Sequence, residues 1–334
     1  MVMVSVGDLA QSFMLKRQTA SLKTEIQRLS TEVVTGKVAD VGRKVSGDFS
    51  TLAAIDSTSA RLRAFGTVIR ETTILAAATQ AVLGTLDTLA SDLTPGLLTA
   101  AASGQQAGID AIASDARNRL EGAMAALNTR IGDRALFAGS QTGGTAVISG
   151  DALLDALQTV VFGAVTAQDV NQRLQTWFDD PAGFSAAAYL GGPPLSQVPI
   201  GIGESVAPGI TATETAVRQT LRGLAMTALL ERGVLAGNLM EQRALTVAAA
   251  QSLLGSQPDR SGLSARLGAA EARLDEASIR NETEATSLEM ARNAAIGVDD
   301  YRTASDLEAA QTQLELLYSI TARLTRLSLV DFLR

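Results

Sequence analysis

Apolar residues recur at alternating intervals of three and four near both ends of the chain. They are Leu15, Leu22, Ile26, Leu29 and Val33 near the start, and Leu307, Leu314, Leu317, Leu324 and Leu327 near the end. This spacing puts each set on one side of an α-helix, as in the seam of a coiled coil. We therefore expect two terminal helices with apolar stripes, and we call these ten residues the predicted seam.

The apolar stripes require a partner. A helix of about 30 residues is about 45 Å long and is marginally stable alone in water. Each buried Leu or Ile contributes roughly 1.5–3 kcal/mol, so the stripe of one terminus gains most by packing on the other and then on neighbouring copies. The spacing predicts termini that become ordered on assembly. An ordinary helical bundle that satisfies itself internally explains the same periodicity equally well.

The composition argues against catalysis. The chain has no Cys and no His, which removes thiolate nucleophiles, disulfides, and the commonest general base and metal ligand. Aromatic residues make up only 4%, and the net charge is −7 with no basic stripe. We expect no enzyme activity, no cofactor, no metal site and no nucleic-acid partner.

Two segment types are not found in the sequence. Met1–Arg17 lacks a basic stretch followed by a continuous apolar core, so it does not predict a cleaved signal peptide. No run of about 18 consecutive apolar residues is present, so we expect no membrane insertion. If the protein is exported, the sequence predicts a route that needs no cleaved signal.

The organisation between the ends is helical, with one interruption. Helices are expected from about Leu52 to a break or kink at Pro95-Gly96, over Gly108–Ala135 and over Thr213–Leu254. A break is expected at Gly255–Gly262. Two further helices are expected from Leu263 to the end of the sequence, with Gly297 between them. Val38–Gly47 is expected to be a loop or small hairpin. Between the expected helices Gly108–Ala135 and Thr213–Leu254, residues 139–212 contain five of the seven prolines and many glycines. Strands are expected there at Ala146–Ile148, Val160–Phe162 and Val198–Ile202, and short helices at Asp151–Val161 and Ala167–Phe178.

The predicted class is mainly α. We expect a long antiparallel helical bundle or coiled coil built from both termini, with a small mixed α/β insert. Residues 1–40 and 297–334 would form the terminal helices of an inner assembly domain, residues 41–138 and 213–296 a helical bundle, and residues 139–212 the insert.

Several polar residues were weighed as sites. Asp299 and Asp300, with Glu308, could suggest a metal or acid/base group, but acids at a helix start ordinarily serve as caps and favour the helix dipole. Asn281 and Glu284 fall on the helix seam, where buried polar groups cost stability and can set register. Four arginines could pair with acids of neighbouring subunits or lie on a solvated face: Arg117, Arg119, Arg130 and Arg134. Gly201-Ile202-Gly203 is expected to be a turn.

Three segments resemble the bacterial flagellins and flagellar hook-associated proteins. They are Arg28-Leu29-Ser30 followed by Thr35-Gly36-Lys37, the run from Ala135 to Thr142 (ALFAGSQT), and the tail from Ile296 to Arg334. The middle segment is similar to one found in the hook–filament junction family, hook-associated protein 3. Ser46-Gly47-Asp48-Phe49 matches the family loop at that place only loosely.

The resemblance implies a flagellin-like structural protein that self-assembles. It implies export through the flagellar type III apparatus and a location outside the cell in the flagellum. Expected partners are further copies, a hook-side junction protein, flagellin and an export chaperone. The terminal helices would lie innermost and the insert outermost. A flagellin filament subunit remains an alternative, and a type III-exported helical adaptor or effector is a second one.

Overall fold

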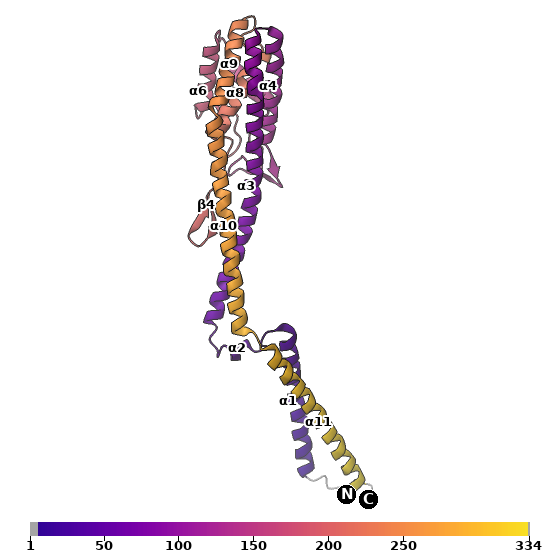
Figure 1. Ribbon diagram of the computed structural model, residues 1–334. Coiled ribbons are helices and arrows are strands. Elements are labelled where there is room, and N and C mark those ends of the chain that lie inside the picture. The colour runs from indigo at the N-terminus through magenta and orange to yellow at the C-terminus, as the bar shows by residue number, and fades with distance from the viewer. Residues whose placement is uncertain (1–5, 333–334) are drawn as a thin grey trace. The chain divides into compact units, whose positions relative to one another are not determined.

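The computed structural model describes the backbone of residues 6–332 and the side chains of residues 10–323. The chain divides into two compact units: residues 1–62 with 282–334 form unit 1, and residues 63–281 form unit 2. Long helices come from both termini and the described strands are short, which confirms the mainly α prediction (Figure 1).

Unit 1 is organised by two terminal helices that pack side by side, α1 (Val6–Thr35) and α11 (Asp300–Phe332) (Figure 1). The expected loop after α1 contains one short helix, α2 (Val41–Lys44), which the side chain of Asp40 caps by accepting from the backbone N–H of Arg43 at 3.0 Å. The helix start and stop residues of the sequence thus place both terminal helices correctly.

The longest helix is α3 (Ser50–Ser103), and it corrects the prediction of a break at Pro95-Gly96. Proline removes one backbone N–H from the helix ladder and normally kinks or ends a helix. Here Leu93 and Leu97 on either side of Pro95 are fully buried. Burial of both side chains against the rest of unit 2 offsets the lost hydrogen bond, so the helix continues for two more turns.

The core of unit 2 surrounds α8 (Thr215–Glu231). The consecutive residues Leu224, Ala225 and Met226 are all fully buried, so this helix is covered on every side. Four helices pack on it: α4 (Gln106–Leu127), α5 (Gly150–Val160), α6 (Ala167–Asp179) and α9 (Leu239–Gly255). A short helix, α7 (Phe184–Ala187), packs on α6.

The expected helix Gly108–Ala135 was predicted too long. α4 ends at Leu127, and residues up to Ala135 form a two-stranded hairpin of β1 (Arg130–Ile131) and β2 (Arg134–Ala135). Asn128 ends the helix because its side-chain oxygen accepts from the backbone N–H groups of Ala146 and Val147, at 2.8 and 3.0 Å. This partner lies far along the chain, so helical periodicity alone did not indicate the end.

The single helix expected over Thr213–Leu254 is instead two helices, α8 and α9, packed on each other. The turn between them contains Gly233 and Gly237, both with positive φ, and Leu235 at φ 58°. The break expected at Gly255–Gly262 is present but shorter than predicted, since only Ser256 separates α9 from α10 (Gln257–Ile296). Pro258 lies in the first turn of α10, where its missing N–H costs nothing.

A small hairpin packs on the long helices in the lower part of unit 2. β3 (Val198–Gly201) pairs antiparallel with β4 (Glu204–Val206), and the expected turn contains Gly203 at φ 73°. Its inward side chains, Ile200 and Val206, are buried with a cluster from α3 and α10: Ile69, Ala270, Leu274 and Ala277. Asn281 donates to the carbonyl oxygen of Ile200 at 3.1 Å, so this polar seam residue holds the hairpin.

The helices expected in residues 139–212 are present as α5 and α6, and the strand at Val198 as β3. Val147 forms only an isolated bridge with Tyr189, and Val160–Phe162 ends α5 and turns, so neither expected strand forms. Apart from the β3–β4 hairpin, these residues share one hydrophobic core with α4, α8 and α9. Whether they are outermost in an assembly stays a prediction.

One described helix, α3, is long and apolar enough to cross a membrane by length and composition alone. It is an exception to the expectation drawn from continuous apolar runs, because Thr, Ser and Gly are spread among its apolar residues. In the apolar 18-residue window of α3 that meets this criterion, 33% is buried inside the chain.

Candidate assembly interface

The paired helices α1 and α11 bring the described part of the predicted seam together. Leu29 and Leu317 are buried, at 4% and 8% exposed. The other described members, apart from Val33, are half-buried: Leu15, Leu22, Ile26, Leu307 and Leu314. The side chains of Leu324 and Leu327 lie outside the described residues. The contact therefore covers the seam only in part within one chain.

Val33 does not share this contact, since it is 38% exposed while its neighbour Glu32 is 4% exposed. The carboxylate of Glu32 accepts from the backbone N–H of Ala39 at 2.9 Å and pairs with Arg28 at 2.7 Å. Apolar spacing favours Val33 at this position. The carboxylate turns inward because the chain reverses there and presents a backbone donor.

A backbone clasp fixes the point where both terminal helices join the rest of unit 1. The N–H of Val38 donates to the carbonyl of Ile296 at 2.9 Å, and the N–H of Val298 donates to that of Gly36 at 3.2 Å. Gly36 has φ 66°, a left-handed conformation that favours glycine. A Cβ at Gly297 would overlap the carbonyl oxygen of Asn293. Both glycines are thus needed by the clasp.

Ion pairs on α1 add local support. Arg28 bonds to Glu25 as well as to Glu32. The hydrogen bond from Arg28 lowers the pKa of the Glu25 carboxyl, and the same bond raises the pKa of the Arg28 guanidinium. Between the helices, the ammonium of Lys23 lies 5.9 Å from the ring centre of Tyr318, a cation–π contact that the sequence analysis missed.

The acids at the start of α11 have a structural role. Asp299 caps the helix by accepting from the backbone N–H of Arg302 at 3.0 Å. Among the described residues, no group of three acidic side chains is placed to hold a metal ion. The hydrogen bond from Arg302 confirms the capping interpretation of Asp299.

Three of the four candidate arginines pair within the chain. Arg117 pairs with Asp151 at 3.0 Å, and Arg119 with Asp115 at 3.0 Å. Arg130 donates to the carbonyl oxygens of Gly143, Gly144 and Asp133. These guanidinium groups fasten elements of unit 2, so they need no neighbouring subunit to be satisfied.

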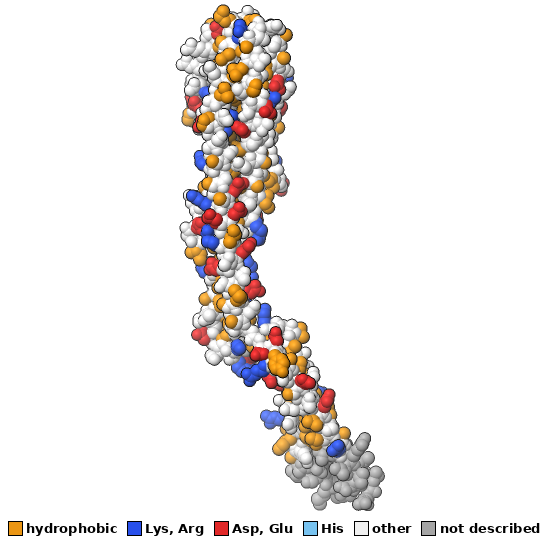
Figure 2. Space-filling view, viewed as in Figure 1, with side chains coloured by type: hydrophobic (Ala, Val, Ile, Leu, Met, Phe, Trp, Pro, Cys, Tyr) orange, Lys and Arg blue, Asp and Glu red, His pale blue; other side chains and the backbone are white. Residues whose placement is uncertain are grey.

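The outer faces of the paired helices carry exposed apolar side chains among charged ones such as Lys16, Arg17 and Glu315. On α1, Phe13 and Met14 are each 70% exposed and Val34 is 82% exposed. On α11, exposed apolar side chains are Tyr301, Leu316, Tyr318 and Ile320. Figure 2 shows apolar side chains at the surface of this unit. Such surface is costly in water and indicates an interaction site.

Three Thr hydroxyls on these faces donate to backbone carbonyls of their own helix. Thr24 donates to the carbonyl of Ala20 at 3.1 Å, Thr31 to that of Gln27 at 2.9 Å, and Thr312 to that of Glu308 at 2.9 Å. The methyl groups of these threonines are therefore available for contact. Burying these three side chains leaves none of their hydroxyl protons without an acceptor.

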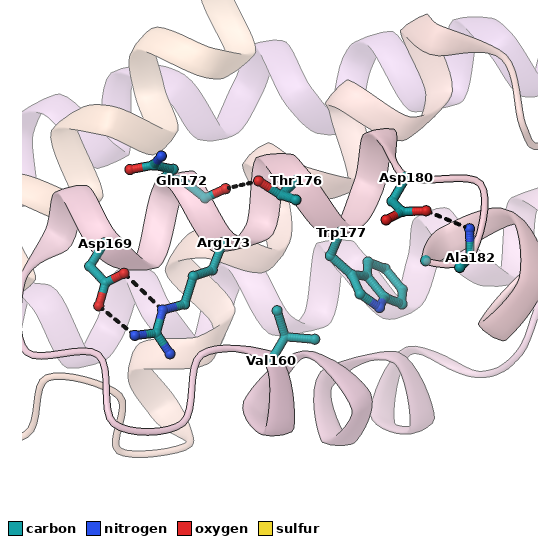
Figure 3. Close-up of a pocket in the computed structure, with 9 residues that line it drawn as sticks. Val160, Asp169, Gln172, Arg173, Thr176, Trp177, Asp180 and Ala182 are labelled. Carbon is teal, nitrogen blue, oxygen red and sulfur yellow. Dashed lines mark hydrogen bonds and ion pairs between the residues drawn. The ribbon is translucent and has the colours of Figure 1, made fainter.

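A described pocket lies on unit 2, between α5 and α6, with a volume of about 600 Å³ (Figure 3). Its charged groups are committed to the fold: Asp169 and Arg173 form two hydrogen bonds of 2.8 Å, and Asp180 accepts from the N–H of Ala182 at 2.8 Å. Trp177 contacts the rings of Phe178 and Phe184. This arrangement has no nucleophile with an adjacent base.

Residues 259–333 match the family model described as the bacterial flagellin C-terminal helical region. The C-terminal segment is flagellin-like. The match spans nearly all of α10 and α11, so one of the two paired helices comes from the flagellin-like segment. Proteins of this kind are structural and non-enzymatic, in agreement with the composition.

The chain also resembles a protein of known structure over most of its length. It is similar to a solved structure from Vibrio parahaemolyticus, described as that of a flagellar hook-associated protein, at 10% identity and a TM-score of 0.48, over 73% of this chain and 95% of that one. No curated protein matches the sequence.

Proposed function

We propose that this chain is a structural component of the bacterial flagellum that joins hook to filament by assembling through its terminal helices. One observation carries the proposal: the flagellin-like segment supplies α11, and α11 packs on α1 while both helices keep large apolar side chains exposed. A helix pair that still exposes large apolar side chains is suited to packing with further helices.

The proposal includes a location and partners. The chain would be exported without a cleaved signal peptide and would act outside the cell. Its partners would be further copies, a hook-side junction protein and flagellin, with an export chaperone before secretion. In the assembly, α1 and α11 would lie innermost, the helical part of unit 2 outside them, and residues 139–212 outermost. Copies would pack through the described seam and through Leu324 and Leu327.

A flagellin filament subunit is the second candidate, and it is favoured by the same flagellin-like segment. The two roles differ in what is lost with the gene. A junction protein is needed for filament attachment, whereas a flagellin is the filament itself. An exported helical adaptor or effector is the remaining candidate, and it would not be required for the filament.

The test is a deletion strain complemented with the full chain or with a Leu317→Asp variant. The junction role predicts that the deletion sheds monomeric flagellin into the medium and carries hooks without filaments, and that only the full chain restores filaments. A hook-bearing strain with no flagellin in the medium would favour the filament subunit. Normal filaments in the deletion strain would overturn both roles.

A further inference from the structure

The solvent-facing side of α3 in unit 2 carries a long uncharged track. Its positions alternate at intervals of three and four, the seam spacing of a helix that packs on another helix. We call them the α3 track: Ile74, Ala77, Ala81, Gly84, Thr88, Ser91, Pro95, Leu98 and Ala102. All nine are exposed in the single chain. Nothing in the described part of this chain covers the face.

The α3 track lacks the charges of an ordinary surface. Between Ile74 and Ala102 the helix has two charged residues: Asp92 is exposed, and Asp87 is half-exposed and pairs with Arg260 at 2.7 Å. Solvent-facing protein surface is normally about a quarter to a third charged. The hydroxyl of Thr88 donates to the carbonyl of Gly84 at 2.9 Å, so it presents its methyl group. This face has the composition of an interface core.

Gly84 gives an independent reason to expect a close neighbour. A glycine inside an exposed helix is destabilising relative to alanine, because it loses more backbone freedom on folding. A Cβ built on Gly84 would meet no heavy atom within 4 Å, so the chain itself does not require glycine. Close approach of another backbone from outside the chain would require it.

A matching ridge lies on α9, also in unit 2. Its outward positions have the same spacing: Met240, Ala244, Val247, Gln251 and Leu254. Met240 is 76% exposed and Leu254 51% exposed. The opposite side of α9 is buried through Leu245, Ala249 and Leu253, so this helix is apolar on two sides. From Ala244 to its C-terminal end, α9 carries no charged residue.

The ridge agrees in length with the small-residue part of the track. The consecutive small positions of the track, Ala77 to Ser91, span about 21 Å, and the ridge from Met240 to Leu254 also spans about 21 Å. Large side chains stand on one face and small ones on the other. Gly84 and Val247 are the central positions, so they oppose each other whichever way the two helices run.

We propose that the α9 ridge of one copy docks on the α3 track of the next copy. Because the two faces differ, the contact is heterologous and repeats from copy to copy, which suits a ring or a tube. This contact lies in unit 2 and does not use α1 or α11. It rests on the proposed function for the identity of the partner, a second copy of the chain.

The test uses the absence of native cysteine. The full-length double variant Gly84→Cys/Val247→Cys is concentrated until it assembles and is then oxidised. The expected result is a ladder of disulfide-linked species that grows with assembly. A matched control, Gly84→Cys/Gln175→Cys, keeps the first cysteine and places the second on the exposed face of α6, and it should give no ladder.

A second variant, Gly84→Phe, tests docking without cross-linking. Since the site is open in the single chain, this variant should fold with unchanged circular dichroism, yet assemble at least tenfold less at the same concentration.

Pelleting of the double cysteine variant without a ladder would overturn this contact and leave terminal-helix assembly standing. Absence of any pelleting would overturn both. A disulfide-linked dimer from Gly84→Cys alone would instead show α3 on α3. Wild-type flotation with anionic phospholipid vesicles, lost in Gly84→Phe, would show a lipid partner; either result overturns the proposal.

Discussion

The backbone N–H of Val38 donates to the carbonyl oxygen of Ile296 across 2.9 Å, and this bond joins segments from opposite ends of the chain. Together with the hydrogen bond from Val298 to Gly36, it joins the segment that follows α1 to the segment that precedes α11. The terminal pair therefore has a defined base. Its far end carries the predicted seam residues whose side chains lie beyond the described ones.

Glu32 is expected to stabilise this base. Glu32→Ala removes the acceptor of the Ala39 N–H and the partner of Arg28, and we expect it to cost roughly 1–3 kcal/mol. Hydrogen exchange at the amides of Val38, Ala39 and Val298 should accelerate. Glu25→Ala is the matched control, because Glu25 is exposed and bonds only to Arg28 among the described residues. Equal acceleration in both variants would contradict the role of Glu32.

Glycines in and near α10 are expected to respond in opposite directions. Gly297→Ala forces a Cβ into the carbonyl of Asn293 and should destabilise unit 1 by about 1–3 kcal/mol. Gly268→Ala meets open space inside α10 and should stabilise the chain by about 1 kcal/mol. Urea unfolding midpoints measure both. A stabilising Gly297→Ala would show that the clasp does not form.

The β3–β4 hairpin offers a matched pair of isoleucines. Ile200 is fully buried, so Ile200→Ala should cost about 2–5 kcal/mol. Ile202, at the turn of the same hairpin, is 73% exposed, so Ile202→Ala should stay within about 0.5 kcal/mol. Thermal unfolding of the two variants gives the comparison. Similar losses would mean that the hairpin is not packed on α3 and α10.

Acid is expected to weaken unit 2 through Asp151. The hydrogen bond from Arg117 lowers the pKa of this carboxyl, and the charge of Arg232 adds to that effect. A lowered folded-state pKa contributes stability above the unfolded value of about 3.9, and this contribution is lost as pH falls through the folded value. The urea midpoint should therefore drop between pH 6 and pH 3. Asp151→Asn should flatten this drop, while Asp92→Asn on the exposed face of α3 should leave it unchanged.

The sequence predicted most of this fold because most elements are set by local signals. The terminal helices follow from apolar spacing, and their limits from Gly36 and Asp299. The errors occur where a contact with residues far along the chain determines whether a helix ends or continues. Asn128 ends α4 by bonding to residues 146 and 147, and Leu93 and Leu97 keep α3 helical through Pro95.

The candidate interface was predicted less completely. Apolar spacing found Leu29 and Leu317 but selected Val33 where the structure buries Glu32. A carboxylate buried by a backbone donor seven residues away leaves no periodic signal. Large exposed apolar side chains such as Phe13, Met14 and Leu316 are not part of the predicted seam.

The central claim is that the apolar side chains of α1 and α11 are fully buried only when copies of the chain assemble. Hydrogen exchange on the wild-type chain tests this claim most directly. Amides of residues 10–34 and 300–323 should exchange far faster than those of the buried helix α8 in a dilute monomer, and should become protected when concentrated protein assembles. Protection of both helices equal to that of α8 in a monomer that never associates would contradict the account.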